Sequence, residues 1–592
     1  MAFDPHYFAK KVLEARSKRG GHSATKFWQR PEIEFQRDDG IRVVLETRDR
    51  QQDPSADVAK LFHPELRPEL RRLFVGSEQQ DRLSESTDLA CFWLLRIPGL
   101  AMLEMEQNPF DLAYFLVDSL SLRSAEPDIP YTANFGGGVS PPLTVGAVAV
   151  DRAWSLRTMF VPEAWGYSIA SKRKSKGDGI IVGHPDTGYA DHIDLDSTRL
   201  IPGLGWNFVE NNADPRDLLN YYGKGSPGHG TATGSVILSE GTVLPPPTSD
   251  EGGTGEPGKV TGVAPAARLV PIRTARKVWW VFSSNLAQAI YHARTKGCHV
   301  VSISMGGRSF RNLQAALHDA VKSNVIVVAA AGNYSPIVVW PARYDACIAM
   351  AATNIDDLPW IYSSCGPEVD MSAPGEGVWR ADRSEAGRGP LDVGPSSGTS
   401  YATANAAGVA ALWLAHHDRS ALVQQAANSG ITLQDMFRAA LINSARQPRV
   451  WNPTMFGAGI INAEKLLATP TMQGAGLPLL RYQPFPASLN ELRGTQGPVD
   501  FRQAQGLIAA SQPEIANIIL TALLNNDVHH LSSNFERWGT EIVNILFDMR
   551  CKKDPLLAQE WTEEKARVSV EPIREAICRR ASTTLHEALK CK

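Results

Sequence analysis

The residue best placed to do chemistry is a serine in the turn 396–403, which runs directly into the alanine-rich apolar segment 404–412. A Gly-Thr-Ser sequence puts this serine, Ser400, at the start of an expected buried helix. Free backbone N–H groups and the positive end of the helix dipole favour a developing oxyanion there, as a serine nucleophile requires. A serine before a helix is more often a simple N-cap, so the other groups of a catalytic site must come from elsewhere in the chain.

Three further polar residues could complete a site with Ser400. Asp186 follows an apolar strand-like run and could orient an imidazole, although aspartate is also common in turns. His229 lies between two glycines, which let other groups approach its ring, and Asn333 could donate from its side-chain amide to an oxyanion. A turn would explain any of the three alone. All four residues in one chain, each beside an expected strand end or helix start, are not expected by coincidence.

The elements that must position these residues lie between about 145 and 470, where short apolar runs alternate with amphipathic helical patterns. Runs typical of buried strands occupy 180–183, 269–272, 299–303, 325–328 and 347–350. This alternation predicts an α/β fold, with a parallel sheet covered by helices on both faces. Sites in such sheets form beyond the carboxyl ends of the strands. Asp186, Ser304 and Asn333 all follow strand ends, so one site could collect them.

The order Asp, His, Ser along the chain is that of subtilisin, and the local motifs agree with it. The region from about 145 to 470 resembles the subtilisin-like serine proteases (subtilases, peptidase family S8). The matching segments are 186–188, 228–231 and 398–402 for the three signature motifs, 332–333 for the oxyanion motif, and 262–265 and 457–463 elsewhere.

The resemblance implies a serine endopeptidase that hydrolyses peptide bonds of protein substrates through an acyl-enzyme. Ser400 would attack the scissile carbonyl, His229 would act as general base and then as general acid, and Asp186 would orient His229. Asn333 and the backbone N–H of Ser400 would hold the oxyanion. A substrate peptide would add as an extended strand along two segments of the chain. These segments consist of Ser304, Met305 and Gly306, and of Ala330, Ala331 and Gly332.

Several positions depart from the pattern of the family. Tyr401 stands where the family usually has methionine, and Ala404 and Asn405 stand where it has a Pro-His pair. None of them is an implied catalytic residue, so we expect activity to survive with altered local packing at the helix entry. The pair 184–185, His-Pro, directly before Asp186 is also unusual.

Val339 is the departure with a consequence for specificity. It precedes a Trp-Pro pair at a position where the family often carries glycine at the base of the main specificity pocket. An isopropyl group there would partly fill the pocket. We therefore expect a smaller residue before the cleaved bond.

The 592 residues are expected to form four regions. They are a charged N-terminal extension (1–84), a β-α-β unit with a linker (85–144), the peptidase domain (145–470) and a helical C-terminal domain (471–592). The resemblance implies that the second region is a prodomain, with self-cleavage within about 130–150; a permanently attached regulatory domain is the alternative. The C-terminal helices are expected to pack their own core, and the alternative is a docking module for a regulatory protein.

Composition excludes several classes of function. The net charge of −3 gives no case for binding nucleic acid or a membrane. The seven cysteines have no metal-ligand spacing and are predicted to be reduced thiols. No signal-peptide pattern opens the chain and no run reaches transmembrane length, which favours a cytoplasmic protein. No cofactor is expected; calcium sites are common in the family, but no ligand cluster here is strong enough to name.

Two alternatives to a protease follow from the sequence. A binding or scaffold protein could keep the protease fold without turnover, but the complete set of Asp186, His229, Asn333 and Ser400 favours an enzyme. An esterase of the α/β-hydrolase type would need a Gly-x-Ser-x-Gly motif and the order Ser, Asp, His. The sequence around Ser400 has neither.

Overall fold

The computed structural model of the chain has two compact units, which are described separately. The first comprises residues 1–129, 309–315 and 484–592, and the second comprises 130–308 and 316–483. The structure describes residues 40–80, 88–98, 108–130, 151–195, 198–219, 226–241, 259–278, 281–383, 390–469, 507, 531–551, 554 and 570–589. The predicted prodomain cleavage segment, most of the Pro/Gly-rich stretch 240–258 and the linker after 469 lie outside these residues.

The second unit is built on a seven-stranded, all-parallel sheet with the strand order β11-β10-β9-β8-β5-β7-β6. Its strands are β5 (Ile181–Asp186), β6 (Trp206–Asn207), β7 (Arg268–Arg273), β8 (Val300–Ile303), β9 (Ile326–Ala330), β10 (Ile348–Thr353) and β11 (Met371–Pro374). A separate antiparallel pair consists of β12 (Val378–Ala381) and β13 (Val393–Ser396). Five of the seven parallel strands coincide with the apolar runs predicted from the sequence.

Helices cover both faces of this sheet. They are α5 (Trp154–Thr158), α6 (Val161–Ala170), α7 (His229–Leu238), α8 (Ser283–Thr295), α10 (Thr399–His417), α11 (Arg419–Asn428), α12 (Leu433–Ser444), α13 (Pro453–Phe456) and α14 (Ala463–Ala468); α9 (Arg311–Lys322) has residues in both units. A side chain at Gly183 of β5 would meet Ala293 of α8, whereas the next residue, His184, contacts Thr233 of α7. Successive strand residues point to opposite faces, so α8 and α7 lie on opposite faces, as predicted.

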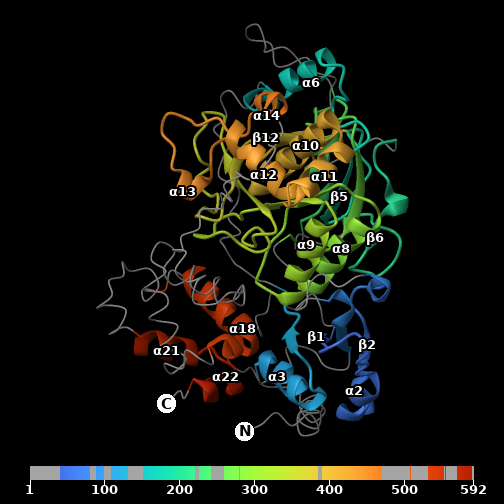
Figure 1. Cartoon of the computed structure of the whole chain (residues 1–592), viewed down its shortest axis with the longest axis vertical. Coiled ribbons are helices and arrows are strands. Elements are labelled where there is room, and N and C mark those ends of the chain that lie inside the picture. Colours follow the sequence, from blue (N-terminus) through green and yellow to red (C-terminus); the bar gives the residue numbers. More distant parts are fainter. Residues whose placement is uncertain are drawn as a thin grey trace. The chain divides into compact units, whose positions relative to one another are not determined.

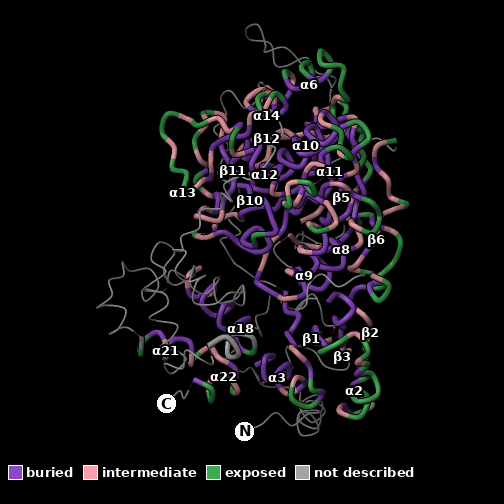
Figure 2. Tube along the Cα trace, in the orientation of Figure 1, coloured by how far each residue is buried: buried purple, intermediate pink, exposed green. Residues whose placement is uncertain are grey.

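Helix α10 is the centre of the second unit. It lies among α11, α12 and α14 (Figure 1) and packs against α7 and against strands β8 to β11. It is buried along almost its whole length (Figure 2), which its alanine- and glycine-rich sequence permits. At Gly408 a side chain would lie 2.5 Å from Val263, so only glycine allows this close approach. The helix that carries Ser400 is therefore buried and tightly packed, so it holds the serine in a fixed position.

The first unit contains a four-stranded antiparallel sheet with the order β2-β3-β1-β4. Its strands are β1 (Ile41–Glu46), β2 (Glu69–Arg72), β3 (Phe92–Ile97) and β4 (Ser124–Pro127), with helices α2 (Ser55–Leu61) and α3 (Pro109–Leu120). The sheet crosses the boundary predicted at residues 84–85. The high charge of the N-terminal residues predicts that boundary, but β1 pairs with both β3 and β4 and gives the small sheet a central strand.

The C-terminal helices α18 (Leu531–Cys551), α21 (Val570–Cys578) and α22 (Thr583–Ala588) belong to this same first unit. The hydroxyl of Tyr114 on α3 donates to Glu541 on α18 at 2.8 Å. Asp111 on α3 accepts from the backbone N–H groups of Thr583 and Thr584 at the start of α22. This differs from the separate helical domain predicted for 471–592, because these helices find their partners on the N-terminal sheet unit.

Buried Glu541 makes the stability of the first unit depend on pH. Burial raises the pKa of Glu541 to about 7, although hydrogen bonds from Ser582 and Tyr114 act in the opposite direction. Since the folded pKa is raised, the unfolded carboxyl ionises first as pH rises, and the folded state loses stability up to pH 7. We expect the free energy of unfolding of this unit to be about 2–3 kcal/mol smaller at pH 8 than at pH 5, measured in the Ser400→Ala protein.

The measurement is thermal unfolding across this pH range, with Glu541→Gln and the exposed Glu571→Gln compared in the same background. Glu541→Gln should flatten the pH dependence, since the amide cannot ionise. Glu571→Gln should leave it as in the parent. Equal slopes in all three proteins would contradict the assignment.

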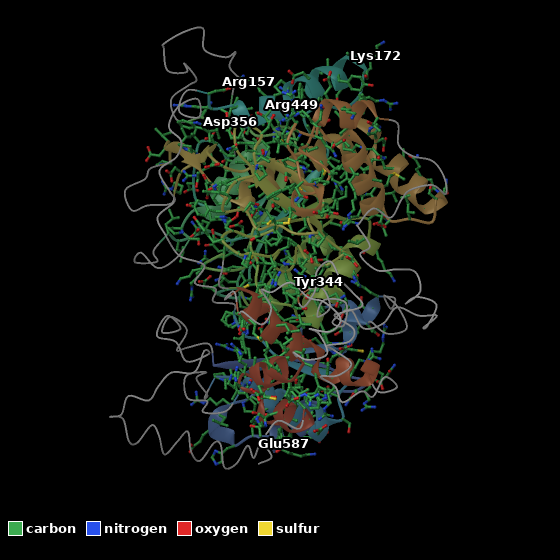
Figure 3. All side chains as sticks on the ribbon, turned by 90° about the vertical axis from the view of Figure 1, so that its left-hand side faces the viewer. Arg157, Lys172, Tyr344, Asp356, Arg449 and Glu587 are labelled. Atoms are coloured by element: carbon green, nitrogen blue, oxygen red, sulfur yellow. The ribbon has the colours of Figure 1, made fainter. Side chains whose placement is uncertain are left out.

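One basic segment of the sequence lies on the surface of the second unit. The basic run 172–176 forms a largely exposed loop after α6, and Lys172 lies at the outer edge of the second unit (Figure 3).

Cys578 is disulfide-bonded, while Cys91, Cys298, Cys347, Cys365 and Cys551 are free thiols. The prediction that every cysteine is reduced is therefore wrong for Cys578, whose role could not be read from spacing. Within the described ranges, no helix is long and apolar enough to cross a bilayer.

Candidate active site

Asp186 and His229 are in direct contact. Asp186 is the last residue of β5 and is fully buried, and His229 is the first residue of α7 and keeps a partly exposed ring. The Nδ1 atom of His229 lies 2.8 Å from Oδ1 of Asp186. Burial alone would raise the pKa of Asp186, but His229 and further hydrogen bonds lower it overall. The ionised carboxylate can only accept, so Nδ1 carries the proton and Nε2 is left as the basic nitrogen.

A buried ion pair ties together the two loops that hold these residues. One carboxylate oxygen of Asp217 accepts from the Thr187 hydroxyl at 2.9 Å and from the backbone N–H of Gly228 at 2.8 Å. Arg273, at the end of β7, donates to the Thr187 carbonyl at 2.5 Å and contacts Asp217 at 3.4 Å. Because Thr187 and Gly228 directly adjoin the Asp-His pair in sequence, this network fixes the distance between them. Asp217 and Arg273 belong to no sequence motif, so local patterns do not predict their role.

Ser400 is the second residue of α10 and is buried. Its Oγ donates to the carbonyl oxygen of Ser304 at 3.3 Å, and the Ser304 hydroxyl donates to the Ser400 carbonyl oxygen at 3.1 Å. The Ser400 hydroxyl must therefore turn away from Ser304 before His229 can take its proton. Apo structures of serine enzymes often show such loosely aligned catalytic groups. Helices α7 and α10, which carry His229 and Ser400 in their first turns, pack against each other.

Asn333 presents its amide N–H₂ group next to this turn. Its Oδ1 accepts from the backbone N–H of Thr399 at 2.9 Å and from the Thr399 hydroxyl at 2.8 Å. With the oxygen occupied on one side, Nδ2 is the atom left to donate to a ligand. A side chain at Gly398 would lie 3.3 Å from Nδ2, so glycine keeps the approach to this donor open. Asn333 and the start of α10 can together stabilise an oxyanion.

The unusual residues of α10 do not disturb the helix. Tyr401 and Ala404 are buried in the hydrophobic core of the second unit. The side-chain amide of Asn405 donates to the carbonyl oxygen of Pro374 at 2.9 Å. The helix runs without interruption from Thr399 to His417, so these three positions pack as part of a regular helix.

Val339 lies between the two segments predicted to bind substrate. A Cβ atom at Gly306 would be 2.5 Å from one Val339 methyl group, and a Cβ atom at Gly332 would be 3.0 Å from the other. The structure thus brings together Gly306, Gly332 and Val339. The side chains of Met305, Ala330 and Ala331 are buried in the protein, so a peptide could use only the backbone of these residues.

The predicted residues thus form two hydrogen-bonded clusters. One contains Asp186 and His229, and the other surrounds the start of α10, with Ser400, Ser304 and Asn333. Among the residues that the structure describes, no cluster of three or more His, Cys, Asp or Glu side chains could hold a metal ion. The arrangement supplies a nucleophile, a base with its orienting carboxylate, and an amide donor for an oxyanion. These groups are what acyl transfer by a serine requires.

Comparisons with known proteins agree with this chemistry. A family model described as the Subtilase family matches residues 177–476. Thermitase from Thermoactinomyces vulgaris is 30% identical over 275 residues, covering 46% of this chain and 85% of thermitase. M-protease from Shouchella clausii is 28% identical over 332 residues, covering 56% of this chain and 73% of that protein. An intracellular serine protease from Paenibacillus polymyxa is 31% identical over 253 residues, covering 40% and 68%.

Proposed function

Because this chain belongs to the subtilase family of serine endopeptidases, we propose that Asp186, His229 and Ser400 are its catalytic triad. The observation that carries the proposal is the 2.8 Å contact between His229 Nδ1 and the buried Asp186. It leaves the other ring nitrogen basic, on a helix that packs against the helix of Ser400. The substrates are proteins or peptides, as for every serine endopeptidase.

The reaction follows from these groups. His229 Nε2 accepts the proton of the Ser400 hydroxyl as its Oγ attacks the carbonyl carbon of the scissile bond. Asn333 and the backbone N–H of Ser400 hold the resulting oxyanion. The imidazolium, stabilised by Asp186, then gives its proton to the leaving amine, and the acyl group stays on Ser400. Water, deprotonated by His229, releases the acid and restores the serine.

Specificity is proposed to depend on Val339. A peptide would lie along Ser304 to Gly306 on one side and Ala330 to Gly332 on the other, adding as an extended strand. The side chain before the cleaved bond would enter the space between Gly306 and Gly332, where Val339 already lies. Small side chains would fit there and large aromatic ones would not.

Location and regulation are further proposals. The similarity to the intracellular serine protease of Paenibacillus polymyxa supports action inside the cell. The sheet unit and the C-terminal helices that share the first unit would regulate the peptidase. Self-cleavage within about 130–150 would separate the N-terminal part of the chain, and an attached regulatory domain remains the alternative.

A fluorophosphonate probe tests the proposed function directly, because it reacts only with an activated serine. The full chain should be labelled stoichiometrically, with the modified residue mapped to Ser400 by peptide mass spectrometry. Ser400→Ala should lose the label, while Ser420→Ala, at an exposed serine in α11, should keep it. A folded protein that takes no label, or takes it at another residue, would support the scaffold function instead.

A further inference from the structure

A second histidine lies beneath the Asp-His pair. His184 is two residues before Asp186 in β5, so both side chains point to the same face of the sheet. The ring of His184 is 1% exposed. Its Nε2 atom lies 3.0 Å from the hydroxyl of Thr233 and 3.7 Å from Oδ2 of Asp186. Polar groups this deeply buried are costly unless they are hydrogen-bonded.

The hydroxyl of Thr233 lies between the imidazole of His184 and the carboxylate of Asp186. It is four residues after His229 on α7, one helical turn away, and is fully buried. Its Oγ1 atom lies 3.2 Å from Oδ2 of Asp186 and 3.0 Å from the carbonyl oxygen of His229. A threonine hydroxyl has one proton, so it can donate to only one of these partners at a time.

The direction of the hydrogen bonds follows from the charges. Burial lowers the pKa of His184, and His229 lowers it further, although Asp186 acts in the opposite direction. The ring is therefore neutral and has one N–H. If Nε2 were the acceptor, it would take the Thr233 proton, and Oδ2 of Asp186 would lose that donor. With Nε2–H as donor, the Thr233 hydroxyl accepts from His184 and is free to donate to Oδ2 of Asp186.

We propose that His184 is a positioning residue that holds the second carboxylate oxygen of Asp186 through the Thr233 hydroxyl. The proposal rests on the proposed triad and adds to it. Oδ1 of Asp186 binds His229 and the backbone N–H of Thr187, and Oδ2 is anchored by the His184–Thr233 relay. Anchors on both oxygens fix rotation of the carboxylate. They also spread its negative charge over several donors.

Two pairs of variants separate this role from simple packing. His184→Val and Thr233→Val remove the donors, whereas His184→Gln keeps a donor at similar reach and Thr233→Ser keeps the hydroxyl. We expect each valine variant to lower kcat by about tenfold with little change in KM. The acid limb of kcat/KM should move to higher pH, because a carboxylate with fewer donors holds the imidazolium more strongly. His184→Gln and Thr233→Ser should recover most of kcat and should return the acid limb most of the way to its wild-type pH.

The double valine variant tests the relay itself. Since both residues act through one hydroxyl, the double variant should lose no more kcat than either single one. Losses that multiply, or a folded His184→Val protein with kcat and acid limb within twofold of wild type, would overturn the proposal. Unfolding temperatures measured in the Ser400→Ala background identify variants that fold.

A spectroscopic measurement keeps this test apart from the proposed function. The downfield proton resonance of the His229 Nδ1–Asp186 hydrogen bond should shift in His184→Val, whether or not the protein turns over substrate. An unchanged resonance in the folded variant would overturn the His184 proposal. If wild type cleaves no peptide and takes no fluorophosphonate, the proposed function fails, and the resonance still decides the role of His184.

Discussion

Replacing Asp186 by asparagine is expected to lower kcat by about 10⁴-fold while KM changes little. The amide has no charge to stabilise the imidazolium that forms when His229 takes the serine proton. Its N–H₂ group can also donate to Nδ1, which would move the ring proton to Nε2, where it blocks proton transfer from Ser400. The buried site, in which Asp186 has no exposed surface, offers no water to replace the lost carboxylate.

The measurement is kcat and KM on a chromogenic peptide, with the rate of fluorophosphonate labelling as a second readout. Asp178→Asn, at an exposed aspartate just before β5, is the matched control and should behave as wild type. A loss smaller than about tenfold in a folded Asp186→Asn protein would mean that another group orients His229.

The chemistry of the candidate site could be predicted from the sequence because each group belongs to a local motif. Asp186, His229 and Ser400 are each flanked by glycine or by small residues within a few positions, and each adjoins an element with a clear apolar pattern. The apolar runs also predicted five parallel strands. Local patterns suffice for such strands because burial on both faces demands continuous apolar residues.

The residues that fix the geometry of the site could not be predicted in the same way. Asp217 lies in a loop and Arg273 at a strand end, and neither belongs to a recognisable pattern; they meet because their elements converge in space. The contact between His184 and Thr233 could not be predicted either. The sequence marks His184 as unusual, but only the packing of α7 on β5 shows that it faces Asp186.

Two short strands and the contacts of the first unit could not be predicted for related reasons. Strand β6 has only two residues, too short for a pattern, and β11 reads Met-Ser-Ala-Pro, which is not a continuous apolar run. The C-terminal helices bury polar groups such as Glu541 against α3, and no local pattern names the partner of a buried carboxylate. Composition placed a boundary near residue 84, yet hydrogen bonding between β1 and β3 crosses it.

Removing the side chain of Val339 is expected to reverse the preference at the residue before the cleaved bond. In Val339→Gly the two methyl groups between Gly306 and Gly332 are lost, so an aromatic ring could enter. We expect the ratio of kcat/KM for phenylalanine over alanine at that position to rise by about 10- to 100-fold. Val339→Ala should give an intermediate ratio, because both γ-methyl groups are lost but the β carbon remains.

The measurement uses two peptides that differ only in this residue, hydrolysed by wild type and by both variants. Val338→Ala is the matched control, because Val338 is also buried but its side chain lies toward Gly366 rather than Gly306. It should lower the unfolding temperature and leave the ratio unchanged. A wild type that already prefers phenylalanine, or a ratio that stays constant from valine to glycine, would show that Val339 does not limit the pocket. A graded rise through alanine to glycine would instead tie specificity to the volume of this one side chain.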